Sequence, residues 1–208
     1  MKTIVEEKFK EWTKKRDPLE KSISIFEHIR EIPFVVDPGC YSLNKGQERM
    51  LRTNKGFCIP KHYLLGAMFW KLGVSVRYCV YFFEWKNIKA SFPVSVKRLV
   101  NGLPIAYHLA CKIFINRKWL LVDATWPLVL KKKGFCVNEA WDGRSAMINA
   151  VEGVDEIIFK NPADADDFLR NKMAEYTLPE KLELSRFSLE LNVWMEKIFK
   201  RHSGHTLR

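Results

Sequence analysis

Three residues with complementary chemistry occur in order along the chain: Cys58, His108 and Asp123. A thiol becomes a strong nucleophile when it loses its proton, an imidazole can accept that proton, and a carboxylate can orient the imidazole. Together they would form the cysteine version of a nucleophile–base–carboxylate triad. The sequence therefore predicts a mechanism, although it indicates much less about a substrate.

Cys58 lies at the predicted start of a helix, between Gly56 and Pro60. Proline suits the first turn because its missing N–H would have no helical partner there. Apolar residues follow almost all round the helix, which indicates that it is buried, and Gly73 would end it. The positive end of the helix dipole favours a thiolate over a thiol. A small buried structural cysteine is the alternative for this position.

Two strand-like segments follow at 106–115 and 118–126, and a two-residue turn at 116–117 would join them as a hairpin. In that register His108 and Asp123 are diagonal neighbours on one face, about 7–8 Å apart at the backbone. Their side chains can close such a gap to a hydrogen bond. A three-residue loop would turn Asp123 to the opposite face. A buried carboxylate is costly without a partner, which favours the pairing.

A zinc site is an alternative use of these residue types. Cys58 and His62 are four residues apart on one helix face, and His108 and Cys111 are three apart. Strand residues three apart point to opposite faces, however, so the four side chains would not converge without a bulge. We therefore predict no metal site and no cofactor. His62 has no evident partner and is interpreted as a surface or helix-packing residue.

Helical patterns flank this region. Residues 1–16 indicate an amphipathic helix, and Asp17-Pro18 starts a second helix that ends near Pro33. Turn residues predict that 34–54 is mainly loop, and residues 74–83 have a strand pattern. Helices, then the nucleophile helix, then an antiparallel sheet make the expected fold class α+β.

Two further helices are predicted near the end of the sequence, one starting at Asn161-Pro162 and one running from Leu178 to about Arg201. We expect one domain over 1–208, with a core at about 17–160 and a C-terminal helical extension at about 161–201. The apolar side of the last helix is predicted at these positions: Leu182, Leu189, Val193, Trp194 and Ile198.

Composition limits the class of protein. Hydrophobic residues make up 47% of the 208 residues, which is ample for a packed core. The net charge is +11, but the basic residues are scattered and form no nucleic-acid recognition motif. We therefore expect them to lie on solvated faces of the protein. A positive electrostatic field would also favour an acidic substrate. No apolar run approaches the ~18 residues of a membrane-spanning helix, and no signal peptide is visible. Five cysteines without framework spacing indicate free thiols in a reducing cytoplasm.

At these residues the sequence resembles the transglutaminase-like superfamily of papain-type cysteine enzymes, in its microbial single-domain form. The resemblance runs from about residue 17 to 127. It is carried by Gly-Phe-Cys at 56–58, by Leu-Gly-Val-Ser-Val-Arg at 72–77 (similar to L-x-G-I/V-P-x-R), by His108 in a strand, and by Asp-Ala-Thr-Trp at 123–126 (similar to D-x-T-W). Upstream, 25–34 is similar to the family's helix and R-x-x-I-x-Y segment.

The resemblance implies a papain-like α+β core with Cys58 as nucleophile, His108 as general base and acid, and Asp123 as orienter. Family members attack amide or ester carbonyls, form a thioester, and pass the acyl group to an amine or to water. Two residues depart from the family pattern: Ile59 follows the nucleophile where animal transglutaminases have Trp, and Ala110 stands two residues after the histidine, where a Trp is often found. Neither a calcium loop nor the extra β-domains of the animal enzymes are expected in 208 residues.

These departures favour hydrolysis of peptide-like amides in a peptide or protein substrate. The alternatives are acyl transfer to an amine by the same triad, and a non-catalytic binding or scaffold protein on the same fold. The backbone N–H of Cys58 is the natural first donor to an oxyanion. Gln47, Tyr41 or a Trp is predicted to supply the second.

Overall fold

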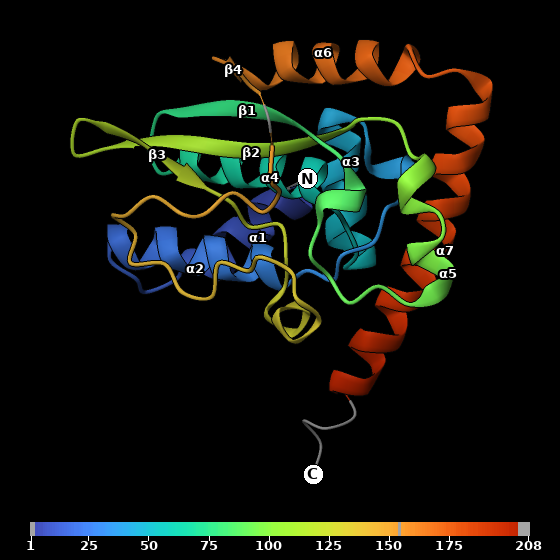
Figure 1. Ribbon diagram of the computed structural model, residues 1–208. Helices are drawn as coiled ribbons and strands as arrows, with labels where there is room; N and C mark the ends of the chain where they lie inside the picture. Colours follow the sequence, from blue (N-terminus) through green and yellow to red (C-terminus); the bar gives the residue numbers. More distant parts are fainter. Residues whose placement is uncertain (1–2, 154, 204–208) are drawn as a thin grey trace.

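The computed structural model describes residues 3–153 and 155–203, and its fold is α+β, as predicted (Figure 1). Four antiparallel strands form one sheet in the order β3-β2-β1-β4. The strands have these bounds: β1 Val76–Phe83, β2 Ala106–Ile115, β3 Lys118–Val122 and β4 Glu156–Phe159.

Helices pack around this sheet and continue beyond it, and Figure 1 shows α7 running along one side of the molecule. The α-helices have these bounds: α1 Ile4–Thr13, α2 Pro18–Glu31, α3 Leu43–Thr53, α4 Cys58–Lys71, α5 Val94–Lys97, α6 Pro162–Ala174 and α7 Leu178–Ser203. Short 3₁₀ helices lie between them: η1 Pro38–Cys40, η2 Trp85–Asn87, η3 Val100–Gly102 and η4 Leu128–Lys133.

Helix α4, which begins at Cys58, lies at the centre of the fold. It packs against β1 and β2 on one side and against α2 and α3 on the other. Every residue from Cys58 to Gly66 is buried, as the apolar pattern predicted. Gly66 permits this packing, because a Cβ there would collide with the hydroxyl of Tyr78 on β1. The start of α4 is therefore held firmly against the sheet.

The β2–β3 hairpin has the predicted register. Asn116 and Arg117 both have positive φ, at 51° and 63°, as a two-residue turn of type I′ requires. Ile115 pairs with Lys118 across this turn. The pairing of β2 with β3 ends at Val122, and its register determines on which face of the sheet the next residue, Asp123, lies.

The prediction of a mainly loop segment at 34–54 is wrong, because α3 occupies 43–53. Gly46, which reads as a turn signal, lies inside this helix. A Cβ at that position would collide with the backbone carbonyl of Cys40, so the glycine allows close packing rather than a turn. Gln47 and Met50 complete the buried face of α3. Tertiary packing therefore overrides the local turn pattern.

The predicted apolar face of α7 is largely wrong. Leu182, Leu189 and Val193 are exposed, whereas Ile198 is buried as expected. Helix α7 has apolar residues on two faces, and its contacts with α5 and η4 decide which face is covered. The residues that α7 buries are Phe187, Leu191, Met195 and Ile198. Among the helices of 3–153 and 155–203, none combines the length and apolar character needed to cross a membrane.

Candidate active site

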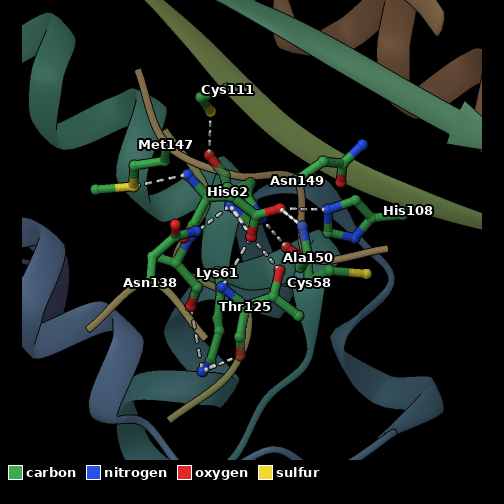
Figure 2. Close-up of polar contacts among 12 residues, drawn as sticks. Cys58, Lys61, His62, His108, Cys111, Thr125, Asn138, Met147, Asn149 and Ala150 are labelled. Atoms are coloured by element: carbon green, nitrogen blue, oxygen red, sulfur yellow. Dashed lines mark hydrogen bonds and ion pairs between the residues drawn. The ribbon is translucent and has the colours of Figure 1, made fainter. Parts of the chain in front are cut away.

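The fold brings the three predicted residues together. Cys58 is the first residue of α4, His108 lies in β2, and Asp123 follows β3 directly. The Nε2 of His108 lies 2.8 Å from Asp123 Oδ2. Both of these residues are 1% exposed, and Cys58 is 9% exposed. Figure 2 shows the His108 ring beside the Cys58 side chain.

His108 is positively charged in this setting. Burial by itself would lower its pKa, but the charge and hydrogen bond of Asp123, together with Cys58, outweigh burial and raise the pKa to about 10. At neutral pH the ring is therefore an imidazolium with two N–H donors. Nε2–H donates to Asp123, which leaves the Nδ1–H for Cys58.

Asp123 is held as a carboxylate by four donors. Oδ2 accepts from His108 Nε2 and from the backbone N–H of Ala150, both at 2.8 Å. Oδ1 accepts from the N–H of Thr125 at 3.0 Å and from its hydroxyl at 2.6 Å. Burial would raise the pKa of Asp123, but the His108 charge and these hydrogen bonds hold it well below its usual range. The carboxylate therefore stays ionised at neutral pH.

A loop that the sequence did not mark as functional encloses this carboxylate. Besides Ala150, the Asn138 amide donates to the carbonyls of Asp123 at 3.0 Å and Ile148 at 2.8 Å. The N–H of Asp123 donates to the Met147 sulfur at 3.3 Å. Figure 2 shows Asn138, Met147 and Ala150 gathered around this part of the site. Ala150 contributes a backbone N–H, for which side-chain identity gives no signal, whereas Asn138 and Met147 contribute side-chain groups.

His62 was interpreted as a surface or helix-packing residue; it is packed inside the protein, not at the surface, and it has polar partners. The residue is fully buried beside the triad. Its Nε2 accepts from the N–H of Ala124 at 3.0 Å, so that nitrogen has no proton. Nδ1–H donates to the carbonyl of Cys58 at 2.9 Å. His62 is therefore neutral, consistent with burial lowering its pKa to about 4. Its 3.5 Å approach to Asp123 Oδ1 is a close contact between two acceptors, not an ion pair.

Lys61 lies beside His62 on α4 and is also fully buried. Its Nζ donates to the carbonyls of Thr125 at 2.9 Å, Arg30 at 3.0 Å and Ala124 at 3.5 Å. Three acceptors match the three N–H groups of an ammonium. Burial lowers the pKa of Lys61 to about 7, partly opposed by nearby carboxylates and Cys58.

Lys61 and His62 together fix the segment that follows β3 to the nucleophile helix. One binds the carbonyls of residues 124–125 and the other binds the N–H of Ala124. A signal for both residues was present in the sequence. A lysine and a histidine within an otherwise apolar buried helix need polar partners, because burying them alone is costly.

A chamber of about 110 Å³ lies against Cys58, and Tyr41, Trp85 and Phe187 are among its lining residues. A larger groove of about 860 Å³ adjoins it, and Tyr41 and Ser188 are among the residues that line both. Gln47 does not line the chamber, and its amide donates to the Leu43 carbonyl at 2.8 Å. Of the predicted oxyanion donors, Tyr41 and a tryptophan, but not Gln47, thus line the same chamber as Cys58.

The thiol and imidazole groups around Cys58 do not converge as metal ligands would. Within the described part of the chain, no three His, Cys, Asp or Glu side chains are arranged to hold a metal ion. The thiol of Cys111 instead donates to the carbonyl of His62 at 3.3 Å.

Replacing His108 by glutamine should give a pH-dependent loss of stability. Because the folded-state pKa of His108 is raised to about 10 from ~6.5, its contribution is complete below about pH 6.5 and is lost as pH rises towards 10. Asp123 must also be ionised, so the wild-type advantage should be largest between about pH 4 and 6.5. Urea denaturation across this range measures it. His28→Gln, at an exposed histidine of α2, is the control. A wild-type stability advantage that grows with pH would contradict the raised pKa of His108.

Comparison with known proteins gives one match of low similarity. No protein-family model matches the sequence, and no curated protein shows significant similarity to it. Among solved structures, the chain aligns with the crystal structure of "a Putative Cysteine Protease from Cytophaga hutchinsonii", with a TM-score of 0.42 and 15% identity. The alignment covers 76% of this chain and 46% of that one, so the chain spans about half of that protein's length.

Proposed function

We propose that the chain is a cysteine-dependent hydrolase of peptide-like amide bonds, with a single transglutaminase-like domain whose core is residues 17–160 and whose helical extension is 161–201. The observation that carries the proposal is the buried His108–Asp123 hydrogen bond beside Cys58 at the start of α4. This arrangement favours a thiolate–imidazolium pair, which is the reactive form of a thiol nucleophile.

The reaction would proceed in two steps. The Cys58 thiolate attacks the amide carbonyl carbon, and the imidazolium of His108 donates its Nδ1 proton to the leaving amine as the C–N bond breaks. A thioester remains on Cys58. Neutral His108 then takes a proton from water, whose oxygen attacks the thioester, and the C–S bond breaks to release the acid and regenerate the thiolate. Asp123 stays ionised throughout and holds the ring in place.

Two groups would stabilise the tetrahedral oxyanion. One is the backbone N–H of Cys58 at the first position of α4. The other is the hydroxyl of Tyr41, because burial, together with the charge of Cys58, raises its pKa to about 12 and keeps it protonated. Each such donor is typically worth ~2.7–4 kcal/mol in the transition state.

The substrate would reach Cys58 through the outer groove. Three basic side chains and one carboxylate line this groove: Arg49, Lys55, Lys181 and Asp37. Arg49 is paired with Asp37 at 2.6 Å and Lys55 with Glu196 at 2.8 Å, so the ammonium of Lys181 is the charge that would favour an acidic residue in a bound peptide or protein segment. All five cysteines are free thiols, three of them buried besides Cys58, which suits the reducing cytoplasm that we propose as the location.

Alkylation of each cysteine, followed by peptide mass spectrometry, tests the proposal. A free thiol of pKa ~8.5 reacts little at about pH 6, and its rate rises about tenfold per pH unit. Because the pKa of His108 is raised to about 10, its proton stays beside Cys58 at about pH 6, and Cys58 should react faster there than the other thiols. His108→Ala should remove this difference. Cys136, an exposed thiol in the same chain, is the internal reference.

Labelling of Cys58 no faster than Cys136 at about pH 6 would contradict the hydrolase proposal and favour a binding or scaffold role. If Cys58 is selectively reactive, hydroxylamine added to an ester substrate separates the two enzymatic alternatives. Product that is only the free acid supports hydrolysis. Product that is mainly the hydroxamate supports acyl transfer to an amine.

A further inference from the structure

The chamber beside Cys58 differs from the groove outside it in its chemistry. Arginine and lysine side chains line the groove, but among the residues that the structure describes no Asp, Glu, Lys, Arg or His lines the chamber. Phe57, Trp85 and Leu184 are among its apolar walls. A charged group placed there would lose water without gaining a partner, which is costly. The chamber therefore selects against charged groups.

The C-terminal helices supply one wall of the chamber. Leu184, Phe187 and Ser188 of α7 line it, as do Met173 of α6 and Tyr176 in the connection between these helices. These residues lie far along the sequence from the triad.

Three contacts hold that wall in position. The hydroxyl of Tyr176 donates to the Ile105 carbonyl at 2.6 Å. The Asn192 amide on α7 both donates to and accepts from the backbone of Val36, at 2.9 Å in each case. The rings of Phe187 and Trp85 lie 4.8 Å apart. The chamber is thus formed before any ligand enters.

The volume of the chamber limits what it can hold. An apolar cavity of about 150 Å³ binds benzene, and the chamber beside Cys58 is smaller, at about 110 Å³. An aromatic ring is therefore accommodated less readily than a smaller aliphatic group. A short branched aliphatic group of the size found in valine or leucine fits both the volume and the apolar lining.

We infer that the acyl group transferred to Cys58 carries a small branched aliphatic side chain next to the reacting carbonyl, with α7 as the wall that selects it. This inference rests on the proposed function and names the substrate class of the same site. Discrimination per methylene in an apolar pocket is roughly 10- to 200-fold. A leucine-type acyl group should thus react at least ~10-fold faster than a glycine-type or aspartate-type group.

N-acetyl aminoacyl chloromethyl ketones with the side chains of glycine, valine, leucine, phenylalanine, aspartate and lysine test this selection on the intact chain. Rates of Cys58 modification are divided by the rates with free glutathione, and iodoacetamide serves as the reagent without a side chain. The valine and leucine reagents should be the fastest, phenylalanine intermediate, and glycine, aspartate and lysine the slowest.

Two variants of Ser188 place the selection in the chamber. Ser188→Arg should raise the rate of the aspartate reagent relative to leucine at least ~10-fold, because it introduces a cation there. Ser188→Leu should slow leucine but not iodoacetamide, because it fills the space. Ser75→Arg is the matched control, since Ser75 is an exposed serine that lines neither the chamber nor the outer groove.

The outcomes separate this inference from the proposed function. Fast labelling by iodoacetamide with no preference among side chains would overturn the aliphatic chamber and leave the hydrolase proposal standing. A preference that Ser188→Leu leaves unchanged would also overturn it. Slow labelling of Cys58 by every reagent, at the rate of Cys136, would overturn the proposed function itself.

Discussion

Asp123→Asn should abolish the selective reactivity of Cys58 and lower the free energy of unfolding by about 3–5 kcal/mol, the usual result of removing one partner from a buried charged pair. Each carboxylate oxygen accepts a backbone N–H, from Thr125 on one side and from Ala150 on the other. An asparagine amide can be turned either way, but its NH₂ group always faces one of these donors. Neither backbone N–H can become an acceptor, so no rotamer repairs the loss.

Urea denaturation and the Cys58 alkylation rate measure the two parts of this prediction. Asp155→Asn makes the same change of charge at an exposed carboxylate and should leave both values close to wild type. If Asp123→Asn unfolds within about 1 kcal/mol of the wild type, the four-donor cage around this carboxylate contributes less than its geometry indicates.

Lys61→Met should lower the free energy of unfolding by about 2–4 kcal/mol, with a slower Cys58 alkylation as a second effect. Methionine keeps the length and apolar stem of the side chain but removes the donors to the Arg30 and Thr125 carbonyls. A buried acceptor left without its donor costs about 1–3 kcal/mol. This loss is partly offset, because an uncharged methionine does not carry the desolvation cost of a buried ammonium.

The pH dependence gives this prediction a sign. The pKa of Lys61 is lowered to about 7 from 10.5, so above about pH 7 the unfolded chain binds more protons at this residue than the folded one. Stability contributed by wild-type Lys61 therefore rises with pH from about 7 to 10.5. The difference between wild type and Lys61→Met should grow over that range. Lys45→Met, at an exposed lysine of α3, should show no such change. Equal stability of Lys61→Met and wild type would refute the stabilising role of the Lys61 hydrogen bonds.

The sequence predicted those parts of the site that depend on local rules. Cys58 was placed at a helix start by Gly56 and Pro60, and both boundaries of that helix follow from backbone preferences. The two-residue turn determined the hairpin register, and with it the pairing of His108 and Asp123. Side chains alternate between the two faces of a strand, so a shift of one residue would have put His108 and Asp123 on opposite faces; the register is therefore well defined.

The parts that could not be predicted depend on tertiary contacts. The N–H of Ala150 is a major ligand of the Asp123 carboxylate, yet any residue other than proline would offer it. Helix α7 has two apolar faces, and only its neighbours determine which is covered. Lys61 and His62 are different, because their polarity within a buried helix was a usable signal. The triad roles and the one-domain assignment stay predictions.

The two amide hydrogen bonds between Asn192 and Val36 attach a late part of the chain to the lip of the chamber. The proposed triad lies between residues 58 and 123, whereas the wall of the chamber that α6 and α7 supply comes from beyond residue 170. On the proposed function, reactivity and selectivity would therefore depend on separate stretches of sequence. Substitutions within α7 would then change which acyl group is accepted and leave the reactivity of Cys58 unchanged.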